Sequence, residues 1–384
     1  MMLRKVKMVT ALVVVCLFTS RAWSEPQNPD DTTAAAQTAP SAQAADFRML
    51  DEFDGKLTLD WKPLRPDPSH FSLTKHPGKL AITTQFGSMH MKRDRPQTKN
   101  VFLLDNPSSE RTGFVATVCL ESFEPTTNWH QAGLMLFDDE DNYLKFVVEL
   151  NNHTEHATGV GPIFNLLREV DGGSSITKTL IEGEVPGKLW LRLTTRGSHH
   201  EYATSTDGET FTVHGELPWG DGSPKQIGLM ATNGSNVDAK EIDAQFDSFE
   251  LRSLTPTELN EPRFVERGKL AGPWKVKSCQ ISGKSFEDAP LSRFVFAESK
   301  VTIVEKERAL EAEYTLDISK EPKQLTLSSF LGQMSGQVRA SYFFEGDALS
   351  ICFALRPGAE APDEFETKKG DGRLLVTLER VQEE

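Results

Sequence analysis

Apolar and polar residues alternate in short runs over most of this chain, and this period of two constrains the fold more than any other feature. Between Phe47 and about Arg252 the runs are separated by Gly, Pro, Asn and Asp, which are residues of tight turns. Long segments with the 3.6-residue period of an amphipathic helix are missing. The pattern therefore predicts an all-β chain that begins with a β-sandwich or a jelly roll.

The 384 residues suffice for about two domains of ordinary size. We place the first domain at 46–252 and a linker at 253–268, where two prolines and several charged residues interrupt the strand pattern. A second all-β domain is predicted over 269–384. Its strand candidates are 274–281, 293–304, 311–317, 323–329, 338–345, 348–355 and 373–381.

The first 24 residues have the order of a secretory signal peptide, with basic residues, an apolar run over 8–18 and the small-residue site Ala22-Trp23-Ser24. The run is too short to span a bilayer, and no later stretch supplies the roughly 18 apolar residues needed. Residues 25–45 predict a disordered leader, being rich in Ala, Thr, Gln and Pro. We expect a secreted or periplasmic protein that is not attached to a membrane once its signal peptide has been removed. A retained signal anchor is the alternative.

The acidic balance of the chain excludes one class of partner. The formal net charge is -14, and the predicted signal peptide holds four cations and no acid, so its removal leaves -18. Such a field repels phosphate backbones, and no basic stripe interleaved with aromatic residues offsets it. We therefore expect no nucleic-acid partner.

Three cysteines would remain after signal removal, so at most one disulfide can form within the chain. Cys352 lies between the predicted inward residues Ile351 and Phe353, which places its thiol on the outer face. The same counting places Cys279 on the outer face. These two cysteines could bridge if their strands are neighbours, which the sequence leaves open. Cys119 is expected to be a free thiol inside the first domain.

Two predicted strands joined by an acidic turn carry polar side chains on one face. The alternation sends Gln131, Lys145 and Glu149 to that face, with Trp129 and His130 at its edge. An amide, an ammonium and a carboxylate can bond sugar hydroxyls, and an indole can stack on a sugar ring. The sequence thus predicts a ligand site on an open sheet surface, and a solvated face with a Lys–Glu cross-strand pair is the alternative.

Two of the segments in this region, DEFDGKLTLDWKPLRPDPSHFSLTKHPGKLAI at 51–82 and NWHQAGLMLFDDEDNYLKFVVELNN at 128–152, resemble a known family. They are similar to the concanavalin-A-like module at the C-terminal end of family 43 glycoside hydrolases. Further matching segments are 187–197, 205–211, 226–234 and 246–251. The resemblance implies a jelly-roll sandwich of two curved antiparallel sheets, with a concave face that can hold a sugar.

The second region resembles another family through LAGPWKVKSCQISGK at 270–284, GDALSICFALRPG at 346–358 and GRLLVTLER at 372–380. These segments are similar to a small domain common in exported planctomycete proteins, of unknown function, which resembles a lipocalin-like β-barrel. In such a barrel Trp274 would plug one end, with Arg380 stacked across its ring within about 6 Å. An ordinary core position for Trp274 is the alternative.

The sandwich resemblance also implies a structural calcium ion, because sandwiches of this kind often fix their termini with one. The hard oxygen donors available for it are Glu52 and Asp54 near the start of the domain and Asp247 on its last strand. Acids at strand ends are also common turn residues, which is the alternative.

No complete catalytic site is evident in the sequence. Glycoside hydrolysis uses two carboxyl groups about 5 to 9.5 Å apart. The acids at 138–141 lie in a predicted turn, and Glu149 has only Val147 and Asn151 at the two-residue offsets. We therefore predict an exported, non-catalytic protein that binds a polysaccharide or glycan. The alternatives are a glycan-active hydrolase with its site between the domains and His130 or Glu149 as base, and a surface protein that assembles with other exported proteins.

Overall fold

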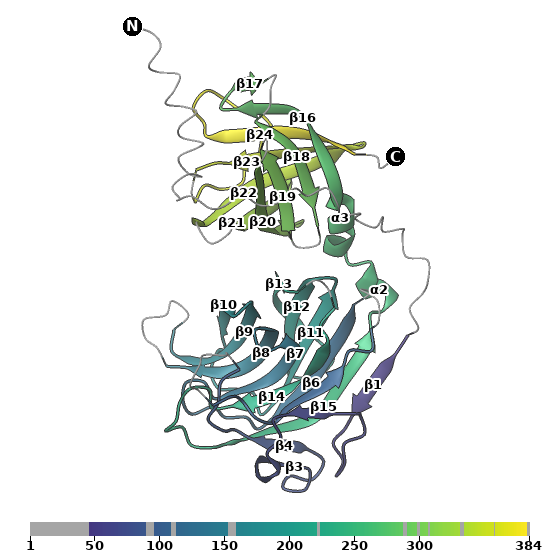
Figure 1. Cartoon of the computed structure of the whole chain (residues 1–384), viewed down its shortest axis with the longest axis vertical. Coiled ribbons are helices and arrows are strands. Elements are labelled where there is room, and N and C mark those ends of the chain that lie inside the picture. The colour runs from purple at the N-terminus through teal and green to yellow at the C-terminus, as the bar shows by residue number, and fades with distance from the viewer. Residues whose placement is uncertain are drawn as a thin grey trace, which may run out of the picture.

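The computed structural model describes residues 46–89, 96–108, 113–152, 159–220, 223–286, 290–297, 300–305, 308–330, 334–356 and 358–381. The predicted signal peptide and leader lie outside these residues. Strands are the dominant secondary structure of the described chain, and they form three sheets (Figure 1). This confirms the all-β fold.

Two antiparallel sheets form the sandwich. The eight-stranded sheet contains β1 (Arg48–Asp51), β3 (Phe71–Ser72), β4 (Leu80–Thr83), β6 (Phe114–Glu121), β11 (Lys188–Arg196), β12 (His199–Ser205), β13 (Thr212–Pro218) and β15 (Asp243–Ser253). The seven-stranded sheet contains β2 (Lys62–Leu64), β5 (Val101–Asp105), β7 (Gln131–Asp139), β8 (Asn142–Asn151), β9 (Gly161–Val170), β10 (Gly173–Leu180) and β14 (Gln226–Thr232). A short 3-10 helix, η1 (Pro68–His70), precedes β3.

The core of the sandwich lies between the two sheets and follows the predicted alternation. Leu134 of β7 and Leu144 and Phe146 of β8 are fully buried there. Trp61 and Phe249 meet edge to face in the same cluster, with ring centroids 5.0 Å apart. Each such side chain stabilises the fold by about 1.5–3 kcal/mol on burial.

The segment predicted as a linker forms two short helices, α2 (Pro256–Leu259) and α3 (Pro262–Leu270). Thr255 and Glu258 make a reciprocal capping box at the start of α2, and each helix has proline in its first turn. Proline is well tolerated there because the first N–H groups of a helix have no partner within it. The prolines that suggested a linker therefore mark helix starts. No helix in the described part of the chain is long and apolar enough to cross a membrane.

The second domain is a closed barrel. Its strands are β16 (Gly272–Ile281), β17 (Lys284–Phe286), β18 (Leu291–Phe296), β19 (Lys300–Glu305), β20 (Arg308–Asp317), β21 (Lys323–Phe330), β22 (Met334–Glu345), β23 (Ala348–Ala354) and β24 (Arg373–Arg380). Each strand from β18 to β24 pairs with the next, and β16 pairs with both β18 and β24, so eight strands close the sheet. The predicted strand 293–304 is in fact the hairpin of β18 and β19. The barrel is consistent with the lipocalin-like resemblance, which stays a prediction.

The predicted contact that closes one end of the barrel is confirmed. The guanidinium carbon of Arg380 lies 4.3 Å from the ring centroid of Trp274, within cation–π range. The indole Nε1 donates to the carbonyl of Leu270, 2.7 Å away, at the end of α3. Helix α3 is therefore joined to the barrel through the same tryptophan.

The outward placement of Cys279 is wrong. A β-bulge between Val276 and Ser278 inserts one residue into β16 and reverses the facing of everything after it, so Cys279 joins the barrel core. Cys352 is the register partner of Leu375 on β24, and its side chain faces outward, as predicted. Cys279 and Cys352 therefore lie on opposite sides of the barrel wall. The two thiols cannot meet across the wall. Cys119, Cys279 and Cys352 are all free and buried. Burial raises the pKa of the Cys119 thiol to about 12 and the pKa values of the other two thiols to about 11.

Helix α3 lies between the two domains and binds both through charged side chains (Figure 1). Arg263 pairs with Glu201 of the sandwich at 3.1 Å, and Glu266 accepts from Lys323 of the barrel at 2.7 Å. A direct ion pair, with nitrogen and oxygen 2.8 Å apart, also joins β9 to β20. The domains thus meet through a network of charges around α3.

Two adjacent histidines are buried at the sandwich end of this interface. His200 bonds the Thr195 hydroxyl and the Trp219 carbonyl, each at 3.0 Å, whereas His199 Nε2 has no hydrogen-bond partner. Burial lowers the pKa of His200 to about 4 and that of His199 to about 2, the latter also through Arg267. Both rings are therefore neutral in the folded protein.

We expect the free energy of unfolding to fall as the pH drops from about 6.5 to 4.5. The unfolded chain then binds protons on His199 and His200 that the folded chain does not, at about 1.4 kcal/mol per pH unit for each ring. The variant His199→Leu should keep the wild-type free energy of unfolding at pH 7.5, because no hydrogen bond is lost. The dependence of its unfolding free energy on pH should be smaller by about 1.4 kcal/mol per pH unit, the contribution of one ring. Urea unfolding at four pH values measures this. An unchanged slope in the variant contradicts the prediction.

Candidate functional site

The structure brings three of the predicted site residues together on the outer face of the seven-stranded sheet, away from the sandwich core. Gln131 and Glu149 are directly opposite each other on β7 and β8. The Gln131 amide donates to Glu149 Oε2 at 2.8 Å, and Lys145 Nζ donates to Gln131 Oε1 at 2.7 Å. The prediction that these side chains share one face is confirmed.

The prediction that this face is open is wrong. Glu149 is 3% exposed, Gln131 4% and Lys145 7%. The same face holds a second apolar cluster, so the polar side chains lie within packed surroundings. Its buried members are Met89, Val101, Leu103, Met135, Phe137, Tyr143, Val147 and Met230. Alternation assigns a residue to a face of a sheet, but it carries no information about what packs on that face.

Glu149 is the centre of the network. Besides Gln131, it accepts a hydrogen bond from the Asn165 amide of β9 and, at 3.3 Å, from the backbone N–H of Trp129. Asn165 is 3% exposed, and its Oδ1 has no hydrogen-bond partner. Sequence reasoning missed this residue, although an asparagine inside the apolar run Ile163–Leu167 is a usable signal. Buried acceptors in folded proteins usually bond a protein group, a water or a ligand.

Lys145 is the only cation in this buried network as far as the structure describes it. Burial lowers the pKa of its ammonium, while the carboxylates of Glu149 and Glu169 act to raise it. Glu169 itself accepts from the hydroxyl of Tyr143 at 2.9 Å. An ammonium has three N–H donors, and one of them is used by Gln131 within the described chain. The network therefore keeps donor capacity on Lys145 and an unsatisfied acceptor on Asn165.

Trp129 extends from the network to the surface. Its side chain is 40% exposed, and its φ of 67° lies in the left-handed region. A Cβ on Gly234 would be 2.5 Å from the Trp129 Cβ, so only glycine fits beside it. Backbone strain of this kind costs on the order of 1–3 kcal/mol and is concentrated at functional sites. The bond to Glu149 and the close approach of Gly234 hold the backbone and Cβ of Trp129 in place.

His130 does not belong to the site. It is fully buried, and its Nδ1 accepts from the backbone N–H of Thr126 at 3.2 Å. Because Nδ1 is an acceptor, Nε2 carries the proton and donates to the carbonyl of Lys240 at 2.9 Å. Both ring nitrogens thus join loops of the sandwich, and burial lowers the pKa of the ring. The alternative role of His130 as a catalytic base is not supported by this position.

The predicted metal ligands Glu52, Asp54 and Asp247 are not brought together. Asp247 forms an ion pair with Lys188 at 3.0 Å, and no group of three His, Cys, Asp or Glu side chains in the described chain is placed to hold a metal. The start of the domain is held instead by the buried carboxylate of Asp51. That carboxylate accepts hydrogen bonds from Phe53, Thr58, Leu59 and Trp61. Structural calcium stays a prediction without this ligand set.

A facing pair of catalytic carboxylates is not evident among the described residues of this sheet face. Glu169 lies opposite Tyr143, which is six residues from Glu149 on β8, so the Cα positions of the two acids are about 20 Å apart along the sheet. Hydrolysis needs about 5 to 9.5 Å between the carboxyl groups. In the acidic turn, Asp139 accepts the backbone N–H of Asp141 at 2.9 Å and stabilises the hairpin. The hydrolase alternative stays a prediction.

A sandwich of two antiparallel sheets with a polar network on one outer face defines a concanavalin-A-like, carbohydrate-related class of domain. Residues 50–252 match the family described as the beta xylosidase C-terminal concanavalin A-like domain, and the chain belongs to that family. The resemblance in the sequence is thereby confirmed. A search of curated proteins found no match.

The chain is also similar to three solved structures, each matched over 53% to 56% of this chain. The Bacillus licheniformis GH43 protein BlXynB is 23% identical with a TM-score of 0.45, covering 53% of this chain and 39% of its own. Xylan beta-1,4-xylosidase from Bacillus halodurans C-125 is 18% identical, with a TM-score of 0.43 and coverage of 56% and 42%. A functionally unknown Saccharomyces cerevisiae protein is 18% identical, with a TM-score of 0.36 and coverage of 53% and 98%. This chain thus spans less than half of the two bacterial proteins.

Proposed function

We propose that this protein is an exported, non-catalytic binding protein that recognises a polysaccharide or glycan at Trp129. The observation that carries the proposal is an exposed indole, fixed in a strained conformation by a buried network that retains an unsatisfied acceptor on Asn165. An indole face stacks on the C–H face of a sugar ring. The carbohydrate-related family of the sandwich supports the same ligand class.

The two parts of the site have different roles in this proposal. Trp129 contacts the sugar, because its side chain is 40% exposed. Glu149 and Gln131 are positioning residues, since both are buried and Glu149 bonds the backbone of Trp129. Asn165 Oδ1 offers an acceptor and the remaining N–H groups of Lys145 offer donors, and in this proposal sugar hydroxyls or water bound to the sugar bond to them.

Trp129→Ala is expected to weaken retention on insoluble xylan at least about tenfold, because stacking and its buried area are lost. Xylan is the first probe because the family is described by β-xylosidase, with cellulose and chitin as further matrices. Phe343→Ala is the matched control, since that aromatic side chain is 37% exposed on the barrel. Pull-down isotherms measure both variants and the wild type.

Retention of Trp129→Ala equal to that of the wild type, on a matrix that the wild type binds, would remove this site from consideration. Trp129→Phe should keep part of the affinity, because a smaller ring still stacks. Release of reducing sugar by the wild type would overturn the non-catalytic part of the proposal. Thermal unfolding of each variant shows whether the fold is kept.

A further inference from the structure

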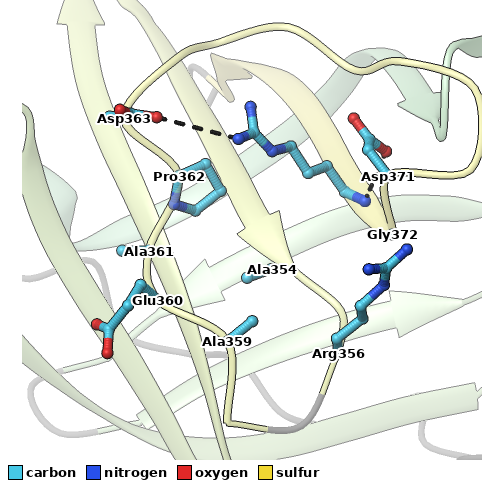
Figure 2. Close-up of a pocket in the computed structure, with 10 residues that line it drawn as sticks. Ala354, Arg356, Ala359, Glu360, Ala361, Pro362, Asp363, Asp371 and Gly372 are labelled. Carbon is cyan, nitrogen blue, oxygen red and sulfur yellow. Dashed lines mark hydrogen bonds and ion pairs between the residues drawn. The ribbon is translucent and has the colours of Figure 1, made fainter.

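The barrel of the second domain is one rigid body. A single cluster of buried side chains runs through it, and such packed interiors deform little. Its long connection between β23 and β24 is tied back to the wall over a hollow (Figure 2). There Arg356 donates to the Gly370 carbonyl at 2.7 Å, and Arg373 pairs with Asp363 at 3.9 Å. A large movement of this domain is therefore to be sought at its joint with the sandwich.

The two short helices of this joint are fixed to different domains. Helix α2 is bound to the sandwich, because Glu258 pairs with Arg252 of β15 at 2.8 Å. Helix α3 is bound to the barrel, where Glu266 accepts from Lys323 at 2.7 Å. Residues 260–261 alone lie between the two helices. Hinges are commonly a few residues at the ends of such elements, so this is the place where one domain can turn relative to the other.

The two sides of α3 are held by different kinds of contact. On the barrel side, Leu270 is fully buried in the barrel core. On the sandwich side, the contacts in the described chain are ion pairs, of Arg263 with Glu201 at 3.1 Å and of Arg267 with Glu216. The direct ion pair between β9 and β20 is of the same kind. Polar interfaces between domains permit relative motion more readily than apolar ones, so the joint opens on the sandwich side of α3.

His199 lies under α3 on this side of the joint. Successive side chains of β12 alternate, so His199 and Glu201 point to the same side of the sheet, and Glu201 is the residue that Arg263 binds. The ring of His199 is 3% exposed, and its Nε2 has no hydrogen-bond partner among the described residues. Arg267 Nε is a second buried nitrogen without a partner here. Dry, unpaired polar groups cost free energy, so water that enters the joint offsets part of what separation loses.

A proton on His199 is uncompensated while the domains are joined. Burial, and then the charges of Arg267 and His200, hold the pKa of the ring far below its usual value. The carboxylates of Glu201 and Glu216 are already engaged by arginines. The charged and titratable groups on the elements at this joint are Arg168 of β9, Arg196 of β11, His200 and Glu201 of β12, Glu216 of β13, Glu261, Arg263, Glu266 and Arg267 of α3 and its N-cap, and Glu313 of β20.

We propose that protonation of His199 releases α3 and the barrel from the sandwich, so that the two domains part in acidic medium and join again at neutral pH. When they part, water reaches the ring, and its pKa returns towards the ordinary value of about 6.5. The parted arrangement then binds a proton that the joined one does not, so each pH unit below about 6.5 favours it about tenfold. His200 takes no part, because both of its bonds are to sandwich residues. This device does not depend on the glycan proposal.

The test is single-molecule energy transfer in the full chain between dyes attached at Val237→Cys of the sandwich and Asp347→Cys of the barrel, both exposed positions. The native thiols are buried and should stay unlabelled. This measurement counts parted molecules while they are still a minor fraction. The ratio of parted to joined molecules should rise about thirtyfold between pH 7.5 and pH 5, the effect of one ring. An unchanged ratio, or a single population at both pH values, would overturn the proposal.

His199→Leu should keep this ratio nearly constant over the same range, because the titrating ring is gone. His76→Leu is the matched control, since it removes a histidine that pairs with Asp243 of the sandwich at 3.0 Å, and it should respond as the wild type does. A full acid response in His199→Leu would assign the parting to a carboxyl group such as Glu201, whose pKa burial raises, and the role of His199 would be overturned.

His199→Arg provides the same test without a change of pH. Arginine carries a permanent positive charge, so this variant should already part the domains at pH 7.5. A population as fully joined as that of the wild type would count against the proposal. Far-UV circular dichroism shows that each variant keeps its strands. Trp129→Ala should give the wild-type response to acid, so the glycan site and this joint fail or stand separately.

Discussion

Glu149→Ala is expected to lower the free energy of unfolding of the sandwich by about 3–5 kcal/mol. The carboxylate compensates the buried ammonium of Lys145 and accepts hydrogen bonds from Gln131, Asn165 and the backbone of Trp129. Its removal leaves a buried charge and three donors without partners, and each such donor costs about 1–3 kcal/mol when it stays dry. Native-state hydrogen exchange of β7 and β8 amides in urea measures the effect within this domain.

The matched comparison for Glu149→Ala is the double variant Lys145→Met/Glu149→Leu. It removes both charges and keeps apolar volume, so it should recover a large part of the lost stability. Val237→Ala, at a side chain that is 70% exposed, should change stability by less than about 0.5 kcal/mol. A cost below about 1 kcal/mol for Glu149→Ala would show that the network is hydrated and that its burial is misjudged.

Trp274→Ala is expected to destabilise the barrel by about 3–5 kcal/mol. The side chain is 1% exposed, its Nε1 donates to Leu270, and Arg380 covers its ring. The alanine leaves a large cavity at the end of the barrel where α3 docks, and the surrounding strands can close it only in part. The β16 and β24 amides should lose protection from hydrogen exchange, whereas β7 and β8 amides should keep theirs.

Arg380→Ala separates the role of the cation from that of the ring. The guanidinium also donates to the carbonyls of Ala271 and Lys269, so this variant should cost about 1–2 kcal/mol, less than the loss of the indole. Trp274→Phe should fall between the two variants, because it keeps most of the apolar volume. If Arg380→Ala and Trp274→Ala lower the free energy of unfolding equally, the indole ring does not close the end of the barrel.

Several features were predictable from the sequence because they depend on local periodicity. Alternation placed Gln131, Lys145 and Glu149 on one face, since successive side chains of a strand point to opposite sides. The all-β class followed from the same period, and Gly272-Pro273-Trp274 with Arg380 predicted the contact at the barrel end. These are statements about one strand or about a family's motif.

Other features depend on which strands become neighbours and on what covers them. One extra residue in the bulge after Val276 turned Cys279 inward, because a slip of one residue reverses the face of a strand. Asn165 reaches Glu149 only because β9 pairs with β8. The burial of Lys145 is a long-range outcome of packing. The sequence by itself therefore determined the faces of the strands, and the tertiary structure decided which of those faces solvent or a ligand can reach, because burial depends on segments that are distant in the chain.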